Sequence, residues 1–434
     1  MIETRHPFYF TVLLWIATRA IIKTCAFAPK VIRHDQHTAH KQQTAYTLCT
    51  IRTSSFALNH HPTTQRYDKT FINYGILISS FTDGILGSLH PKDRDSKIFL
   101  KYSLLSLFAM DIRNKLENKV EDSVKNSPCA GPNIEYLNSL ETIDTILQSN
   151  SENHNGMNHM NKTHVLKEYL QSYLRQNTHN APLINLKLLY IPTAMYALRS
   201  DSQNTPGKQR QRARADGKKR RDQLVSFLQT VLDEELNIES KNTCVSTVTL
   251  DLDDGSIKQP YHTSHKDASI TFPTDGKDAL TVWNPHIVYV EGGNTFWLWH
   301  CIDKGDWGKL IVDTCCTEKD SSRRPSLYIG KSAGAIVAGK YVETACWKGW
   351  DDPSIVPGRE EYNDWKNCIG LNMAGGASFF PHMTEEWTDL VEEKMSEMGL
   401  HRHKDFDHKH GLYALDDNNA CCIEGSSRTI MLVE

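Results

Sequence analysis

The stretch "YIGKSAGAIVAG" (Tyr328–Gly339) places one serine between glycines, after an apolar run and before a series of small residues. Its segment GKSAG (330–334) matches the pattern G-x-S-x-G, in which a tight turn from a strand into a helix exposes the serine hydroxyl at the edge of a sheet. The helix behind the turn offers backbone N–H groups to a developing oxyanion. The stretch therefore predicts an α/β fold with a nucleophile elbow at Ser332. An ordinary strand-to-helix turn with serine as the helix N-cap is the alternative.

The rest of the chain alternates strand and helix patterns around this elbow. Short apolar runs predict buried strands at 73–81, 186–194, 245–253, 286–293 and 326–330, and apolar residues spaced three and four apart predict a helix around 224–232. Strands that are apolar on both faces are typical of a parallel sheet covered on both sides. We therefore expect a mostly parallel sheet with helices on both faces. The segments "GLYALDD" and "ACCIEG" (411–417 and 420–425) indicate a terminal hairpin.

The composition of the chain limits the classes of partner that we expect it to bind. The 434 residues carry a formal net charge of only -3, so no global field favours nucleic acid or membranes as partners of the mature chain. The basic run at 208–221 has no interleaved aromatic residues, and we interpret it as a solvated helix face rather than a nucleic-acid patch. The eleven cysteines form no CxxC pairs and are expected to be mostly reduced and structural. No phosphate-binding glycine loop is present, and we predict no cofactor.

The amino-terminal residues have the character of targeting segments. The apolar run "FYFTVLLWIA" (8–17) has the length of a signal peptide, which would end near residue 26. Residues 27–68 are rich in Thr, Ser, His and basic residues and poor in acids, the bias of a transit peptide. The junction "CAFAP" resembles the two-part presequences of algal plastids. We therefore predict import into the plastid, with secretion as the alternative.

Residues 69–434 are expected to form the catalytic domain. Within it, residues 90–185 lose the regular alternation, and we interpret them as a partly disordered insertion with one helix near 103–120 and an amphipathic piece at 165–174. The run "HRHKDFDHKH" (401–410) has a composition that zinc sites use but no defined ligand spacing, so solvation is the preferred interpretation and no metal site is predicted.

Two further motifs bear on the chemistry of Ser332. A serine needs a base to take its proton, and His382 in "ASFFPHMTEEW" stands at the junction of an apolar run and a helix that begins near Thr384. Upstream, "VEGGNTF" ends a buried strand in two glycines, which let the backbone approach a substrate closely. A packing histidine and a plain strand end are the alternatives for these two motifs taken alone.

Four motifs in a fixed order now carry a family resemblance. "VEGGNTFWL", "YIGKSAGAIVAG", "FFPHM" and "YALDD" together resemble the dipeptidase E (peptidase E, α-aspartyl dipeptidase) family of serine peptidases, relatives of cyanophycinase. The resemblance covers roughly residues 71–88 and 186–434. It implies a class I glutamine-amidotransferase-like, flavodoxin-like α/β fold and a peptidase that cleaves short peptides, dipeptides in particular, through an acyl-enzyme.

The resemblance also implies roles for single residues. Ser332 would be the nucleophile and His382 its general base, with Gly293 and Ala333 supplying the oxyanion N–H groups. Asn294 and Thr295 would contact the substrate.

The acid that orients His382 is left open by the resemblance. It would fall on Asp417, with Asp416 adjacent, or on Asp352, with Asp351 adjacent. Either carboxylate suits the chemistry, because a carboxylate on the far ring nitrogen fixes the histidine tautomer.

Some residues depart from the family pattern. Glu343 stands where aspartyl-specific relatives carry an arginine, which favours a basic over an acidic substrate group. Glu291 replaces a glycine of some relatives. Trp347 and Trp350 belong to an inserted "CWKGWDDP" and either form a wall of the pocket or pack inside.

Several functions remain open on the sequence alone. The rivals of the peptidase are an α/β-hydrolase esterase, a cyanophycinase-like hydrolase of an aspartate/arginine polymer, and a non-catalytic binding protein on the same fold. We expect a small peptide substrate and a monomer or homodimer.

Overall fold

A computed structural model describes residues 71–79, 94–126, 133–149, 158–176, 184–200, 202–235, 242–264, 270–316, 323–356, 368–402 and 411–433. The predicted signal peptide and transit-peptide segment lie outside these residues, so plastid import stays a prediction.

The chain is organised around an eight-stranded sheet in the order β11-β10-β1-β6-β5-β2-β3-β4. In that order the strands are Thr429–Val433, Ala420–Glu424, Tyr74–Ile78, Leu327–Lys331, Ile287–Val290, Ile184–Ile191, Thr243–Asp251 and Ser256–His262. The five strands from β1 to β3 pair in parallel, while β4 and β10 join antiparallel at either side. The mostly parallel sheet predicted from the sequence is confirmed, and the five predicted strands are its parallel centre.

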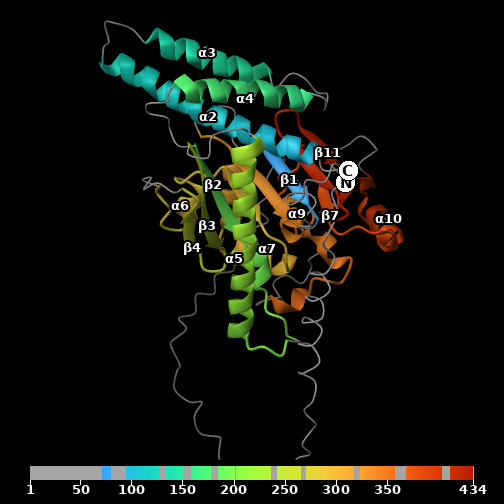
Figure 1. Cartoon of the computed structure of the whole chain (residues 1–434). Helices are drawn as coiled ribbons and strands as arrows, with labels where there is room; N and C mark the ends of the chain where they lie inside the picture. Colours follow the sequence, from blue (N-terminus) through green and yellow to red (C-terminus); the bar gives the residue numbers. More distant parts are fainter. Residues whose placement is uncertain are drawn as a thin grey trace, which may run out of the picture. The chain divides into compact units, whose positions relative to one another are not determined.

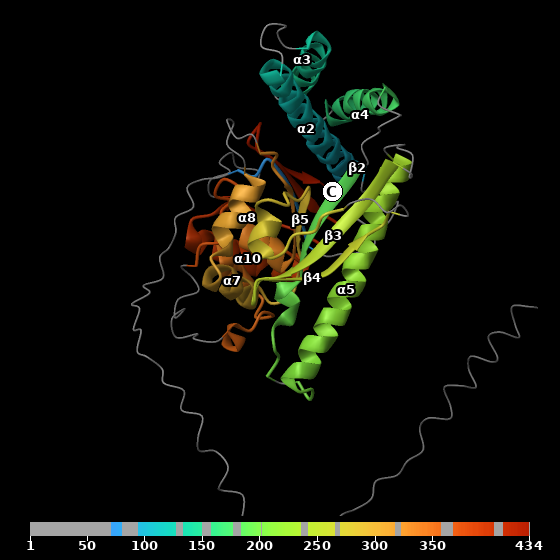
Figure 2. The same ribbon diagram turned by 90° about the vertical axis from the view of Figure 1, so that its left-hand side faces the viewer.

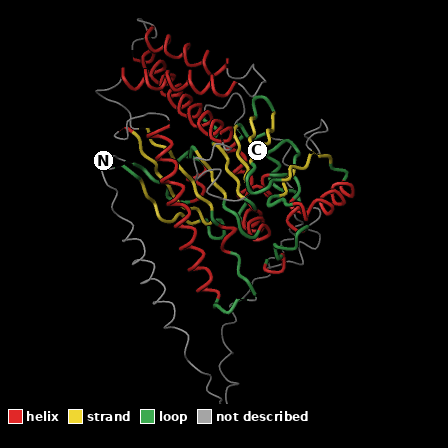
Figure 3. Tube along the Cα trace, turned by 45° about the vertical axis from the view of Figure 1, so that its right-hand side comes forward, coloured by secondary structure: helices red, strands yellow, loops and turns green. Residues whose placement is uncertain are grey.

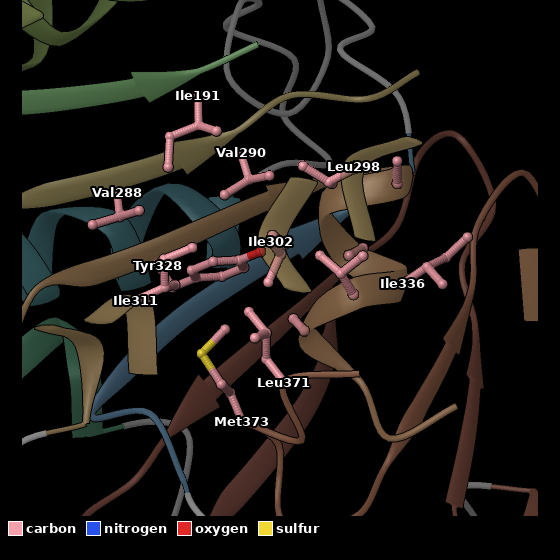
Figure 4. Close-up of a cluster of buried hydrophobic side chains, with 14 of the residues drawn as sticks. Ile191, Val288, Val290, Leu298, Ile302, Ile311, Tyr328, Ile336, Leu371 and Met373 are labelled. Atoms are coloured by element: carbon pink, nitrogen blue, oxygen red, sulfur yellow. The ribbon is translucent and has the colours of Figure 1, made fainter. Parts of the chain in front are cut away.

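Side chains alternate between two apolar clusters on the two faces of this sheet. On β2, Leu189 and Ile191 join one cluster with α7 (Thr295–Lys304), α8 (Trp307–Cys315) and α9 (Ala333–Ala338). Leu188 and Tyr190 join the other with α2 (Arg94–Asn126), α4 (Asn158–Gln176) and α5 (Pro206–Thr230). Figure 2 shows α5 and α7 on opposite sides of the strands, and Figure 4 shows the first cluster around Tyr328. Both faces are therefore buried, as a parallel sheet requires.

The predicted insertion contributes a layer of helices. In its described part, α2 packs against both α3 (Ile134–Ser149) and α4, and Figures 1 and 3 show the three helices at one end of the sheet. An ion pair of 2.6 Å between Arg113 Nε and Asp144 Oδ1 links α2 to α3. Leucines of α2 and α4, such as Leu104 and Leu170, are fully buried in the second cluster. The described residues of the insertion thus belong to the folded core, and α3 was not predicted.

Helix α5 carries the basic run. It begins after Thr205, whose side chain accepts a hydrogen bond from Lys208 N, with Pro206 in the first turn, and it leads into the π-helical turn Val231–Glu235. The interpretation of the run as a solvated face is wrong for Arg221, which is 2% exposed and donates to Thr249 and to the carbonyl of Gln259. The helix therefore uses this arginine to hold the strand layer.

The C-terminal strands do not form the predicted hairpin. β9 (Gly411–Ala414) belongs to a second sheet of three strands with β7 (Ser378–Phe380) and β8 (His401–Arg402), whereas β10 pairs with β1 and β11 in the main sheet. The chain crosses from one sheet to the other in the turn that contains Asp416 and Asp417. This turn therefore lies where the two sheets meet, instead of at the tip of a hairpin.

The remaining elements are short. They are α6 (Gly276–Leu280), α10 (Thr388–Met398) and the 3-10 helices Thr193–Tyr196, Val342–Cys346, Pro353–Ile355 and Glu385–Trp387. Among the described residues, no helix has the length and apolarity needed to cross a bilayer. The same residues hold no metal-binding group of histidines, cysteines and acids. The side chains of the histidine-rich run 401–410 lie outside the described part of the chain.

Candidate active site

The turn at Ser332 has the strained backbone of a nucleophile elbow. Ser332 follows β6 directly, precedes α9, and has φ 46° and ψ -105°, a region that side chains rarely adopt. Its N–H donates to Ile78 O of β1 at 2.9 Å, which fixes the turn to the neighbouring strand. A Cβ on Gly330 would stand 2.6 Å from Gly334 O, and one on Gly334 would stand 2.4 Å from Val290 O. The two glycines of the motif are therefore required sterically, and the serine is not an ordinary N-cap.

His382 lies between Ser332 and Asp417. Its Nε2 is 3.1 Å from Ser332 Oγ, and its Nδ1 is 2.8 Å from Asp417 Oδ1. If the carboxylate accepts a hydrogen from Nδ1, the neutral ring leaves Nε2 as an acceptor for the serine hydroxyl. The three side chains come from three parts of the fold: the turn after β6, the segment after β7, and the crossing from β9 to β10. The arrangement has the order of contacts that a serine hydrolase uses.

The structure distinguishes the four acids that the sequence left open. Of these four acids, only Asp417 bonds to the ring of His382. Asp416 instead accepts from Asn418 N and Asn419 Nδ2 within the turn, and Asp352 accepts from Ser354 N at the start of a 3-10 helix. Asp351 accepts from Thr295 N at 2.9 Å. Burial raises the pKa of Asp351, while its bonds to Thr295 and the charge of His382 oppose that rise.

Ser79 is a member of the site that sequence reasoning missed. It is fully buried at the end of β1, its Oγ donates to Asp417 Oδ1 at 2.9 Å, and it accepts from His382 N at 2.5 Å. One hydroxyl thus links the backbone of the histidine to the acid that holds its ring. The only available signal was its place after an apolar strand, at the edge of the sheet where Ser332 was expected.

Lys348 is the second residue that was missed. Its Nζ donates to Pro381 O at 2.7 Å and also to His382 O, and it lies over the rings of Trp350 and Phe380. His382 has φ 56°, so these bonds hold a backbone conformation that favours glycine. Burial lowers the pKa of Lys348 to about 8, against the charges of Asp417 and Glu386. The tryptophan-rich insertion was noticed in the sequence, but its lysine was not.

A buried ion pair lies directly behind the elbow. Lys331 Nζ is 2.8 Å from Glu291 Oε1, and the same carboxylate accepts from Tyr190 OH at 2.8 Å and Gly292 N at 3.1 Å. Arg220 of α5 reaches it at 3.2 Å. Glu291 is 1% exposed, so this network fixes the ends of β5 and β6 against one another. The unusual glutamate therefore has a partner in the lysine of the elbow.

The predicted oxyanion residues lie around the elbow. Ala333 is the first residue of α9 and is fully buried. A Cβ on Gly292 would stand 3.0 Å from Ser332 Cβ, so Gly292 is the glycine that abuts the serine side chain. Gly293, with φ 146°, packs against Ala194, whose carbonyl oxygen would be 2.4 Å from an added Cβ. The role of the Gly293 N–H toward an oxyanion stays a prediction.

The predicted substrate-binding residues separate into two groups. Asn294 lines a cavity of about 510 Å³ together with Gly293 and Trp350, and its side chain also caps α7 by accepting from Trp297 N. Thr295 is fully buried and does not line this cavity. Glu343 does not line it either. The pKa of Lys394 on α10 is raised mainly by the hydrogen bond that Lys394 donates to Glu397, and the charge of Glu343 adds the smallest contribution.

The cavity lies next to the site without including its reactive side chains: Gly293 and Trp350 line it, whereas Ser332 and His382 do not. Trp350 is 60% exposed and its ring centre is 5.8 Å from that of His382, while Trp347 is buried against Phe380. One tryptophan of the insertion therefore forms a wall and the other packs. Charged residues of both signs, Arg199 and the pair Asp351 and Asp352, also line the cavity.

The known proteins that are similar to this chain come from the peptidases. Residues 270–431 match the model of peptidase family S51. A solved structure of a candidate peptidase E protein from Listeria monocytogenes EGD-e is 16% identical, with a TM-score of 0.30, and the match covers 59% of this chain and 90% of that one. No curated protein matches the chain. Residues 270–431, which contain Ser332, His382 and Asp417, are therefore similar to peptidase family S51, in line with the resemblance to the dipeptidase E family that the motifs carry.

Proposed function

We propose that the chain hydrolyses short peptides, dipeptides in particular, through an acyl-enzyme on Ser332. The observation that carries the proposal is the unbroken series of contacts from Ser332 through His382 to Asp417, with 3.1 Å and 2.8 Å between the bonded atoms. A serine hydroxyl becomes an effective nucleophile when a neighbouring base takes its proton in the attack. This geometry provides the base and the acid that orients it.

In the first half of the reaction, Ser332 Oγ attacks the scissile carbonyl and its proton passes to His382 Nε2. Negative charge develops on the carbonyl oxygen, where we assign the N–H groups of Ala333 and Gly293 as donors. Asp417 stabilises the imidazolium that forms. The C–N bond then breaks, and the leaving amine takes the proton from His382.

In the second half, water attacks the acyl carbon and gives a proton to His382 Nε2. The bond to Ser332 Oγ breaks, the proton returns to the serine, and the carboxylate product leaves. The cavity of about 510 Å³ beside the elbow has room for a few residues of substrate and suits a short peptide. Its acids and Arg199 provide partners for the charged ends that a dipeptide carries.

The test is turnover of a dipeptide panel by the purified chain beside Ser332→Ala. We expect Ser332→Ala to lose about 10⁴ to 10⁶ in kcat and to lose labelling by a fluorophosphonate, with an unchanged melting temperature. Ser354→Ala, in the 3-10 helix near the cavity, is the matched control and should be labelled normally. Equal turnover by the wild type and Ser332→Ala would refute the mechanism, and absence of labelling in the wild type would favour a binding protein.

A second candidate is a cyanophycinase-like hydrolase of an aspartate/arginine polymer. Arg199 and the acids Asp351 and Asp352 line the same cavity, which provides partners for both kinds of side chain. The polymer and an aspartyl-arginine dipeptide are therefore compared in the same assay. Cleavage of the polymer with no turnover of free dipeptides would replace the first candidate by the second.

We also propose that residues 1–68 direct the chain to the plastid. Their composition supports this proposal, as described above. A fusion of these residues to a fluorescent protein should reach the plastid of an algal cell. Appearance in the culture medium would support secretion instead.

A further inference from the structure

We propose that a second cavity, at the amino ends of β2, β5 and β6, binds a small anion with two negative charges. The cavity measures about 350 Å³ and lies between the sheet and the helices α2 and α4. Its lining includes Asp111 and Lys115 of α2, Lys187 of β2, His286 before β5 and Arg324 before β6. Because these strands are parallel, the cavity is at the edge of the sheet opposite Ser332. The inference does not rest on the proposed function.

The charges that line this cavity do not balance. Lys115, Lys187 and Arg324 face a single carboxylate, Asp111. Both oxygens of Asp111 are already engaged, Oδ1 by Arg324 Nε at 2.7 Å and Oδ2 by His286 Nε2 at 2.8 Å. Within the described part of the chain, no ion pair joins Lys115 or Lys187 to a carboxylate. An excess of positive charge is therefore held in a half-enclosed space.

His286 adds no charge at neutral pH. Lys187 N donates to His286 Nδ1 at 3.1 Å, so that nitrogen must be an acceptor and the hydrogen is on Nε2, toward Asp111. Burial, and next the charge of Arg324, lower the pKa of His286 to about 4. The pair with Asp111 is thus a neutral imidazole on a carboxylate. Two lysine charges remain without a counter-charge.

Lys187, which lines the cavity, is destabilised as a cation. Lys187 Nζ donates a hydrogen bond to Trp283 O at 2.9 Å. Burial, and next the charge of Arg324, lower the pKa of Lys187, and Asp111 opposes this only in part. A bound anion would relieve the repulsion and replace the lost hydration. The cavity therefore has an electrostatic reason to bind an anion rather than a cation or an apolar group.

The lining also provides neutral hydrogen-bond donors. Asn185 Oδ1 accepts from Cys244 Sγ at 3.3 Å, and Asn284 Oδ1 accepts from Arg323 Nε at 3.2 Å. With their oxygens used inside the protein, these amides have their NH₂ groups to offer. Oxygen-rich anions such as phosphate and dicarboxylates accept several such bonds. Arg324 is tied by Nη1 and Nη2 to the carbonyls of Pro285 and Asn284, so its part is to hold Asp111 in place.

The test measures anion binding to the full chain by calorimetry and by thermal melting. Inorganic phosphate and succinate are each titrated against chloride at matched ionic strength and neutral pH. We expect one of them to bind with a saturable rise in melting temperature, and the one that binds identifies the anion as a phosphate or a dicarboxylate. Lys187→Met should weaken binding by about tenfold or more, because it removes a half-buried charge from the cavity.

Lys115→Gln gives the same test without a change in the sheet, because Lys115 is exposed on α2. It should also weaken binding, whereas Lys119→Gln, four residues further on α2 and outside the cavity lining, should bind as the wild type. Two outcomes would overturn the inference. One is that neither anion gives a saturable effect beyond chloride, and the other is that Lys115→Gln and Lys187→Met bind as tightly as the wild type.

Discussion

At each end of the parallel strands, a histidine is bonded to an aspartate. His286 Nε2 lies 2.8 Å from Asp111 Oδ2, and His382 Nδ1 lies 2.8 Å from Asp417 Oδ1. The second ring nitrogen also has a partner at 3.1 Å in both. That partner is the Ser332 hydroxyl for His382 and the Lys187 backbone N–H for His286. A hydroxyl can give up a proton and a backbone N–H cannot. The contacts of the second ring nitrogen therefore suit the proposed role of His382 as a base and a structural role of His286.

Solvent exposure also distinguishes the His382–Asp417 pair from the His286–Asp111 pair. The side chains of His382 and Asp417 are 28% and 52% exposed, whereas that of His286 is only 4% exposed. A substrate can reach the first pair, and the imidazolium formed there can be solvated. At the other edge, burial and Arg324 keep His286 neutral. We therefore assign the His382–Asp417 pair to the proposed reaction and the His286–Asp111 pair to packing.

The strongest way to test this comparison is to remove each histidine in turn. His382→Ala should lose about 10⁴ to 10⁶ in kcat, as loss of a triad base does elsewhere, with little change in melting temperature. His286→Gln should instead lower the melting temperature, because it breaks buried hydrogen bonds. The readouts are steady-state turnover and thermal melting. A loss of turnover in His286→Gln as large as that in His382→Ala would erase the distinction.

The second-largest expected effect is that of replacing Asp417, the acid of the proposed catalytic pair. Asp417→Asn should reduce kcat by about 10⁴, because an amide fails to fix the tautomer with its hydrogen on Nδ1. Asp416→Asn is the matched control, since Asp416 bonds only within its turn among the described contacts. Turnover of the two variants is compared at one pH. Equal rates for Asp417→Asn and the wild type would show that another residue orients His382.

The buried pair predicts a dependence of stability on pH. Because the pKa of His286 is about 4 when folded and about 6.5 when unfolded, the unfolded chain binds the extra proton between these values. The contribution of neutral His286 to the free energy of unfolding is therefore present above about pH 6.5, and it decreases by about 3 kcal/mol as the pH falls toward 4. The free energy of unfolding, measured with denaturant across this pH range, should change less with pH in His286→Gln than in the wild type, that is, with a shallower slope. The same slope in both proteins would contradict the assignment.

The smallest expected effect concerns Lys348. With a pKa of about 8, its ammonium is lost as the pH rises, and with it the strongest bonds to the backbone of His382. We expect kcat/KM to fall a few-fold above about pH 8 in the wild type and to fall later in Lys348→Arg, which keeps its charge. Lys340→Arg, whose Nζ lies over Tyr341, is the control. If kcat/KM falls at the same alkaline pH in all three proteins, Lys348 has no role in the site.

The sequence predicts the elbow and the parallel sheet because their signals are local. The glycines around Ser332 are required by contacts within the turn and with β5, and such steric needs are visible as a short motif. The apolar residues of the strands likewise indicate that both faces of the sheet are buried. His382 could be singled out for the same reason, since it follows a strand and precedes a helix.

The rest of the site depends on where distant segments meet. Asp417 could not be chosen over Asp352, because that choice follows from β9 and β10 belonging to different sheets. Ser79 is separated from His382 by 303 residues, and no spacing rule relates them. Lys348 acts through carbonyl groups, which carry no sequence signal at all. Tertiary placement decides all three.

The position of β1 has a consequence for maturation. This short strand pairs with β6 on one side and β10 on the other, and the residue after it touches both Asp417 and His382. If residues 1–68 are removed as a leader, as we propose, the cut must fall before Phe71. A cut further along the chain would shorten or remove the strand that joins β6 to β10.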